Sequence, residues 1–131
     1  MGTLIDTSIL IEAERGRLNL AEHLNETEEY FVSVITASEL LHGLHRSAGT
    51  PVSYRRRIFI EEVLNRFPLL DIDFEVARNH SRIWAELVRA GKVIGMNDLW
   101  IAATCLSHDQ KLATRNVREF KRVSGLVVEV W

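Results

Sequence analysis

Apolar residues in this chain gather in short runs that end in polar or turn-forming residues. The first run, Leu4-Ile5, stops at Asp6, and the second, residues 30–34, is aromatic and β-branched. Short runs of this kind are typical of strands buried in a sheet. The pattern predicts strands at residues 4–5, 30–34, 69–72, 112–114 and 127–130.

The segments between these runs carry a helical spacing. Ala37, Leu40, Leu41 and Leu44 fall at i, i+3, i+4 and i+7, which places them on one buried stripe of a helix that begins near residue 36. Further helices are predicted at residues 8–14, 18–25, 54–66, 74–90 and 99–106, with a single helical turn at 116–120. Strands that alternate with helices predict an α/β fold, in which a central parallel sheet of about five strands is flanked by helices on both faces.

The predicted helix at residues 74–90 has a defined start, end and face. Asp73 is placed to cap its first turn, and Gly91 is placed to end it. Its apolar face is broad, and we expect it to include Trp84 and Val88.

Composition narrows the class of protein. The chain has 131 residues, of which 47% are hydrophobic, so we expect one globular domain over residues 1–131. No run of 18 or more apolar residues is present, and the N-terminus has neither a basic leader nor a signal-like apolar region. We therefore expect a cytoplasmic protein without membrane contact. Cys105 is the single cysteine, which excludes an internal disulfide and a cysteine-based zinc site.

The charge balance limits how the chain can hold nucleic acid. With 16 basic and 18 acidic residues the net charge is −2, which argues against a broad electrostatic grip. Any contact with nucleic acid must therefore be local. Basic residues do cluster at Arg55-Arg56-Arg57 and around Arg115, although each group also suits the solvated face of a helix.

Acidic or amide residues recur where a predicted strand ends or a predicted helix begins. Asp6, Glu39, Asp98 and the pair Asn116 and Glu119 share this context. Each taken alone suits a helix cap, because a side-chain oxygen there accepts from free backbone N–H groups. Taken together they converge, because right-handed crossovers bring all the strand C-termini to one edge of a parallel sheet.

Such a convergence has a chemical consequence. Carboxylates within a few ångströms of one another raise each other's pKa, and a divalent cation relieves their repulsion. A ligand set of oxygens, without cysteine, suits Mg²⁺ or Mn²⁺ rather than Zn²⁺. Ions of this kind polarise phosphoryl oxygens and activate water, which suits phosphodiester hydrolysis.

These same segments resemble a known family. The segments Leu4-Ile5-Asp6-Thr7-Ser8, Ser38-Glu39-Leu40, Asn97-Asp98-Leu99-Trp100-Ile101-Ala102-Ala103 and Thr114-Arg115-Asn116-Val117-Arg118-Glu119-Phe120 are similar to motifs of the PIN-domain ribonucleases, above all the VapC-type toxins of prokaryotic toxin–antitoxin pairs. The resemblance implies a PIN fold and a Mg²⁺- or Mn²⁺-dependent endoribonuclease. It also implies a homodimer and a small VapB-type antitoxin whose C-terminal segment covers the acidic groove.

The family's acids fall on particular positions of this chain. Its three most constant acids correspond to Asp6, Glu39 and Asp98, which the resemblance makes metal ligands and catalytic residues. A fourth acid is common where this chain has Asn116, and another, usually Asp, where it has Glu119. It is therefore open whether the fourth contact to metal or water is made by Glu119, is made by the Asn116 amide, or is weak.

Other residues are candidates for supporting the acids or for binding RNA. Ser8 and Thr114 match hydroxyl positions that hold carboxylates or water in the family, although here they also suit helix caps. Arg115 is the first candidate for a phosphate contact, and the run Arg55 to Arg57 is a candidate for RNA contacts farther from the site.

Two other functions stay open. In the first, the fold is kept but the acidic groove only docks a basic antitoxin segment, and Asn116 favours this version. The second is a metal-dependent phosphotransfer or phosphatase domain, for which Asp71-Ile72-Asp73 offers an Asp-x-Asp pattern. That pattern lies on the third predicted strand and has no following threonine, which favours a strand end and a helix cap instead.

Overall fold

The central element is a five-stranded parallel sheet with the order β3-β2-β1-β4-β5. The computed structural model describes residues 1–131. The strands are β1 (Thr3–Ile5), β2 (Tyr30–Ser33), β3 (Leu69–Leu70), β4 (Lys111–Thr114) and β5 (Val128–Val130). The prediction of a parallel sheet of about five strands is confirmed.

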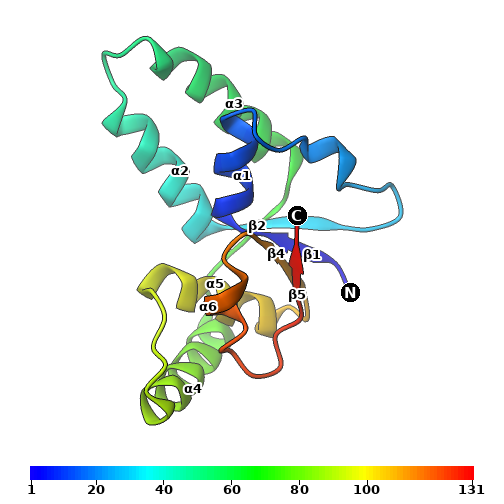
Figure 1. Cartoon of the computed structure of the whole chain (residues 1–131), viewed down its shortest axis with the longest axis vertical. Coiled ribbons are helices and arrows are strands. Elements are labelled where there is room, and N and C mark those ends of the chain that lie inside the picture. Colours follow the sequence, from blue (N-terminus) through cyan, green and yellow to red (C-terminus); the bar gives the residue numbers. More distant parts are fainter.

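The middle strand explains why helices cover both faces. Leu4 and Ile5 on β1 are both completely buried, and because neighbouring side chains of a strand point to opposite faces, each joins a different hydrophobic cluster. Ile5 packs with α1 (Thr7–Glu14), α2 (Val34–Arg46) and α3 (Val52–Arg66). Leu4 packs with α4 (Phe74–Ala90), α5 (Met96–Ser107) and α6 (Val117–Phe120). Figure 1 shows these two groups of helices on opposite sides of the sheet.

The ends of α4 match the sequence expectation, but its apolar face does not. The Asp73 side chain accepts a hydrogen bond from the backbone N–H of Val76, and Gly91 adopts the left-handed conformation that ends the helix. Trp84 and Val88 are more than half exposed, at 54% and 56%. The buried part of the apolar face is therefore narrower than predicted: Val76, Ile83 and Leu87 are buried, whereas Trp84 and Val88 are not.

Several element boundaries also differ from the prediction, and helix α5 starts at Met96, three residues earlier than expected. The helix expected at residues 18–25 is only a 3₁₀ turn, η1 (Leu20–Glu22). The Asn19 side chain caps its start by accepting from the Ala21 N–H, and the Asn25 side chain accepts from the Thr27 N–H in the turn that follows. The third strand stops at Leu70. Helix α2 starts at Val34, two residues earlier than expected, because the Ser33 hydroxyl accepts from the Ile35 N–H and caps it.

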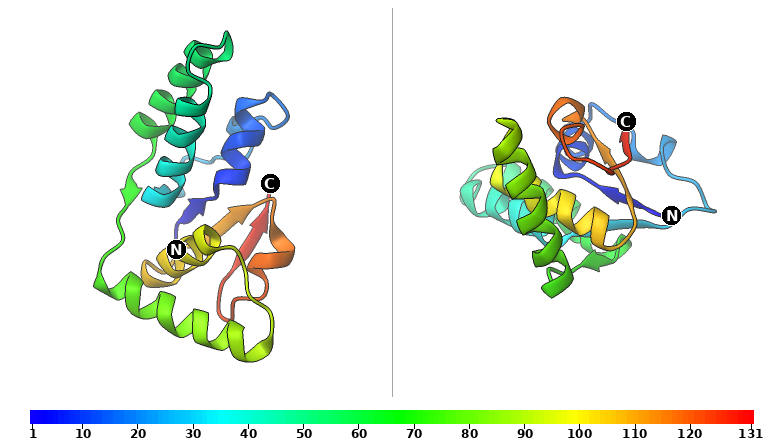
Figure 2. Two further views of the ribbon diagram at one scale, coloured as in Figure 1. Left: turned by 90° about the vertical axis from the view of Figure 1, so that its left-hand side faces the viewer. Right: turned by 90° about the horizontal axis from the view of Figure 1, so that it is seen from below.

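The topology brings three helix starts together. β2, β1 and β4 are neighbours, and each runs within three residues into a helix: α2, α1 and α6 respectively. The carboxyl ends of parallel strands share one edge, so Asp6, Ser33 and Asn116 all lie along that edge. Figure 2 shows the start of α5 reaching the same edge. None of the helices is long and apolar enough to cross a membrane.

Candidate active site

Asp6 occupies the centre of the shared edge. It follows β1 directly and is only 3% exposed. Its Oδ2 accepts hydrogen bonds from the hydroxyls of Ser8, at 2.6 Å, and Thr114, at 2.7 Å. Its Oδ1 is buried and has no hydrogen-bond partner. A buried carboxylate oxygen without a donor is costly, so Oδ1 is available for a cation or a proton.

The two hydroxyls that hold Asp6 are themselves held in place. Ser8 Oγ and Thr114 Oγ1 lie 3.2 Å apart, so they bridge α1 and β4. The backbone N–H of Arg115 donates to Ser8 Oγ, and that of Asn116 donates to Thr114 Oγ1. Both hydroxyls therefore orient the Asp6 carboxylate, and neither caps the helix that follows it in sequence.

Glu39 reaches the site from the neighbouring strand unit. It is the sixth residue of α2, one and a half turns from its start. Its Oε1 accepts a hydrogen bond of 2.7 Å from the Thr7 hydroxyl, and Thr7 also lies 2.8 Å from the buried Thr36 hydroxyl. Sequence reasoning assigned no role to Thr7, although it follows Asp6 directly. The first residue of α1 thus positions an acid of α2.

Asp98 and Glu119 form the other side of the site and are joined by one amide. The side-chain amide nitrogen of Asn116 donates to Asp98 Oδ2 at 3.1 Å and to Glu119 Oε2 at 3.2 Å. Asp98 comes from the first turn of α5 and Glu119 from α6. Asn116 therefore connects two acids that lie 21 residues apart in the sequence.

The acids influence one another electrostatically. The pKa of Asp98 is raised from its usual 3.8 to about 6, first by burial and then by the nearby charges of Asp6, Glu119 and Glu39. The Asn116 hydrogen bond acts in the opposite direction and lowers it. The charges of Asp6, Glu39 and Glu119 are thus close enough to oppose the ionisation of Asp98, as the sheet-edge argument predicted.

Helix capping does not explain these residues. The caps of α1, α5 and α6 make no side-chain hydrogen bond, and α2 is capped by Ser33 rather than by Thr36 and Glu39. The Asp98 and Asn116 side chains instead contact other members of the site. The capping alternative for the individual acids is therefore wrong, because their side chains point into the shared edge.

The donor chemistry fits a hard divalent cation. The site offers carboxylate oxygens and the Asn116 amide, while Cys105 is buried in the core. No three His, Cys, Asp or Glu side chains form a ready-made metal cage. Mg²⁺ commonly binds to one or two carboxylates and keeps several of its waters, so a partly open acidic site with a free Asp6 Oδ1 suits it.

The predicted RNA-binding arginines have different surroundings. Arg115 donates to the backbone carbonyl of Trp131, at 2.5 Å, and its guanidinium lies 4.0 Å from Glu12. Arg55 and Arg57 are exposed on α3. Arg56 instead pairs with Glu14 at 2.6 Å and donates to the backbone carbonyl of Gly43. Arg56 thus tethers α3 to α1 and α2, a structural role that the sequence did not indicate.

Asp71 and Asp73 do not take part in the site. Asp73 caps α4, and Asp71 is exposed in the segment before it. The Asp-x-Asp pattern is therefore a strand end followed by a cap, and it gives no support to a phosphotransfer site.

Comparisons with known proteins agree with this architecture. The PIN domain family model matches residues 3–126. Ribonuclease VapC1 of Rickettsia felis is 37% identical over 98% of this chain and 95% of its own length. A tRNA(fMet)-specific endonuclease VapC of Salmonella typhimurium is 33% identical over 86% of this chain and 87% of its own. Among solved structures, VapBC2 from Rickettsia felis, bound to a DNA fragment from its promoter, aligns with a TM-score of 0.90 at 26% identity, covering 100% and 99% of the two chains. This chain belongs to the PIN-domain family and, within it, to the VapC ribonucleases.

Proposed function

We propose that this ribonuclease is a Mg²⁺- or Mn²⁺-dependent endonuclease in which Asp6, Glu39 and Asp98 hold the metal. One observation carries the proposal: Asp6 Oδ1 is buried without a partner, next to Asp98, whose pKa is raised to about 6 by burial and then by the charges of the other three acids. A site built this way stores repulsion that a divalent cation relieves. Glu119 adds a fourth carboxylate, which the Asn116 amide nitrogen holds beside Asp98.

The residues of the chain then have separate tasks. Ser8 and Thr114 fix the Asp6 carboxylate, and Thr7 fixes Glu39. Asn116 holds Asp98 and Glu119 at a set separation. A bound divalent cation supplies charge neutralisation at the phosphoryl oxygens and lowers the pKa of water. Hydrolysis adds the water oxygen to phosphorus, breaks the bond between phosphorus and O3′, and leaves a 5′-phosphate and a 3′-hydroxyl.

Partners follow from the same proposal. The Rickettsia felis neighbour is a VapBC complex, so we propose a small VapB-type antitoxin whose basic segment covers the acids of this chain. The Salmonella relative is named for tRNA(fMet), which makes initiator tRNA the first RNA substrate to test. The expected homodimer stays a prediction, and the exposed apolar side chains of Trp84, Val88 and Met96 favour it.

The decisive experiment measures cleavage of initiator tRNA by the purified chain. We expect cleavage with Mg²⁺ or Mn²⁺, none with EDTA, and a loss of at least about a hundredfold in Asp6→Asn and Asp98→Asn with the circular dichroism spectrum retained. Asp71→Asn is the matched control, because it removes one exposed carboxylate outside the site.

Two outcomes would overturn the proposal. Cleavage that persists in EDTA or in Asp98→Asn would place the chemistry elsewhere. Absence of cleavage across a panel of RNAs, with tight binding of the antitoxin, would establish the docking module instead.

A further inference from the structure

A groove beside the acids contains cations that the proposed chemistry does not use. It has a volume of about 390 Å³ and lies between α1, α2 and α3. Thr7, Glu39 and Asn97 line the end of this groove nearest the active site. The groove is therefore continuous with the site, and any strand lying across the acids can extend into it. We call it the α1–α2 groove.

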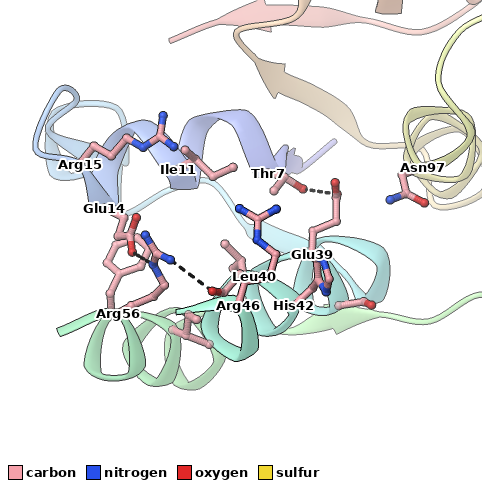
Figure 3. A pocket seen from close by; sticks show the side chains of 14 residues that line it. Thr7, Ile11, Glu14, Arg15, Glu39, Leu40, His42, Arg46, Arg56 and Asn97 are labelled. Atoms are coloured by element: carbon pink, nitrogen blue, oxygen red, sulfur yellow. Dashed lines mark hydrogen bonds and ion pairs between the residues drawn. The ribbon is translucent and has the colours of Figure 1, made fainter. Parts of the chain in front are cut away.

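The groove runs away from the active site along one face of α2. Glu39, His42, Gly43 and Arg46 all line it, and they stand at i, i+3, i+4 and i+7 of one helix. That spacing places Arg46 about 10 Å along the helix axis from Glu39. Figure 3 shows the Arg46 guanidinium pointing across the groove toward α1.

Two of the arginines that line the groove have no ionic partner. Of the groove's three arginines, Arg56 is neutralised by Glu14 at 2.6 Å. Arg15 and Arg46 are exposed, and their guanidinium groups make no ion pair or hydrogen bond within the chain. The groove thus presents two unpaired guanidinium groups beside an acidic site.

These free cations meet a physical need of the reaction. The net charge of the chain is −2, and the four acids repel the phosphates on either side of the scissile bond. Nearby cations must offset that repulsion for a polyanion to lie across the site. Guanidinium groups suit this task, because they stay charged and bind phosphate oxygens in pairs.

We infer that the α1–α2 groove binds the RNA strand flanking the scissile bond, with Arg46 and Arg15 contacting its phosphates. This inference rests on the proposed function and adds to it a flanking-strand subsite. Ile11, Leu40 and Phe59 also line the groove, which gives the sugar and base an apolar surface. Arg46, on the same stripe as Glu39, makes the nearer contact, and Arg15 makes the farther one.

The test compares Arg46→Gln and Arg15→Gln with Arg89→Gln. Arg89 is exposed on α4, outside the groove, so this control removes the same charge from another surface. After the wild-type cleavage position is mapped, kinetics are measured on a single-stranded RNA extended on both sides, and on RNAs truncated on the 5′ or on the 3′ side.

We expect Arg46→Gln to raise KM for the extended RNA about tenfold while kcat stays within about twofold. The effect should vanish when one particular flank is truncated, which identifies the flank that occupies the groove. RNA binding is also measured in EDTA, where the RNA stays intact. The plot of the logarithm of the binding constant against the logarithm of the salt concentration should become less steep by about 0.7 for each phosphate contact removed. Arg89→Gln should behave as the wild type.

Three results would overturn the inference. The first is a KM effect that is equal for all RNA lengths, and the second is an equal effect in Arg89→Gln. The third is unchanged RNA binding combined with weaker antitoxin binding, which would assign the groove to the protein partner. Failure of the wild type to cleave any RNA would instead refute the proposed function, so the two failures are distinguishable.

Discussion

The side-chain amide of Asn116 donates a hydrogen bond to Asp98 Oδ2 at 3.1 Å. Asn116 stands at a position where the PIN-domain ribonucleases often have a further acid. The same amide group holds Glu119 at 3.2 Å. An amide here stabilises ionised acids without adding a charge of its own. The metal-free site is therefore less strained than one with an added carboxylate.

Replacing Asn116 by Asp should lower the stability of the metal-free chain and raise its affinity for metal. Asn116→Asp adds a carboxylate beside Asp98 and Glu119, so we expect the metal-free chain to lose about 1–2 kcal/mol in its free energy of unfolding. Mn²⁺ should bind about threefold to tenfold more tightly, since affinity rises with ligand charge. Urea unfolding in EDTA and calorimetric titration measure the two effects. Asn116→Ala is the control, and tighter Mn²⁺ binding in that variant would contradict the charge argument.

The raised pKa of Asp98 predicts a particular pH dependence. Between its usual 3.8 and about 6, folded Asp98 keeps a proton that the unfolded chain has lost. Stability from this group is therefore complete below about pH 4 and is lost as the pH rises through about 6. After allowance for solvent screening, we expect Asp98 to change the free energy of unfolding by roughly 1 kcal/mol across this pH range.

A second carboxylate changes stability in the opposite direction, so the measurement must separate the two. Hydrogen bonds from Lys111 and then Thr3 lower the pKa of Glu28 from 4.5 to about 2, which stabilises the fold above pH 4.5 and is lost as the pH falls toward 2. Urea unfolding in EDTA should be compared between the wild type and Asp98→Asn from pH 4 to 7. Parallel stability curves for the two proteins would show that Asp98 titrates normally.

The Thr114 hydroxyl should matter more for metal binding than its methyl group does. Thr114→Val keeps the shape of this buried side chain but removes one of the two donors to Asp6 Oδ2. We expect a loss of about 1–2 kcal/mol in stability and about 10-fold or more in Mn²⁺ affinity. Thr114→Ser retains the hydroxyl and should bind Mn²⁺ within about twofold of the wild type. Equal Mn²⁺ affinities in both variants would remove Thr114 from its positioning role.

Metal binding should stabilise the folded chain. At a free Mg²⁺ concentration of about a hundred times its dissociation constant, linkage predicts about 2.7 kcal/mol of added stability. Thermal unfolding with and without Mg²⁺ measures this as a rise in Tm. Asp6→Asn should lose the rise, because it replaces the buried, partnerless oxygen by an amide. An unchanged rise in that variant would show that Mg²⁺ binds elsewhere.

Local patterns in the sequence determined most of the fold. The strands β1, β2 and β4 follow from short apolar runs, and the cap at Asp73 and the end at Gly91 follow from residue type. These features depend on near neighbours in the chain, which the sequence shows directly. The same patterns failed at residues 18–25, where Asn19 caps only a short 3₁₀ turn and the Asn25 side chain bonds the Thr27 N–H beyond it.

The sequence by itself also determined that Asp6, Glu39, Asp98 and Asn116 share one edge, because the topology of a parallel sheet leaves little choice. Only the tertiary structure decided how they meet. In the folded chain the Asn116 amide donates to two carboxylates, and Thr7 donates to Glu39. Asp6 Oδ1 has no partner, and Arg56 forms an ion pair whereas Arg46 does not. Hydrogen bonds and ion pairs act over a few ångströms, and that separation is set by packing between elements that are far apart in sequence.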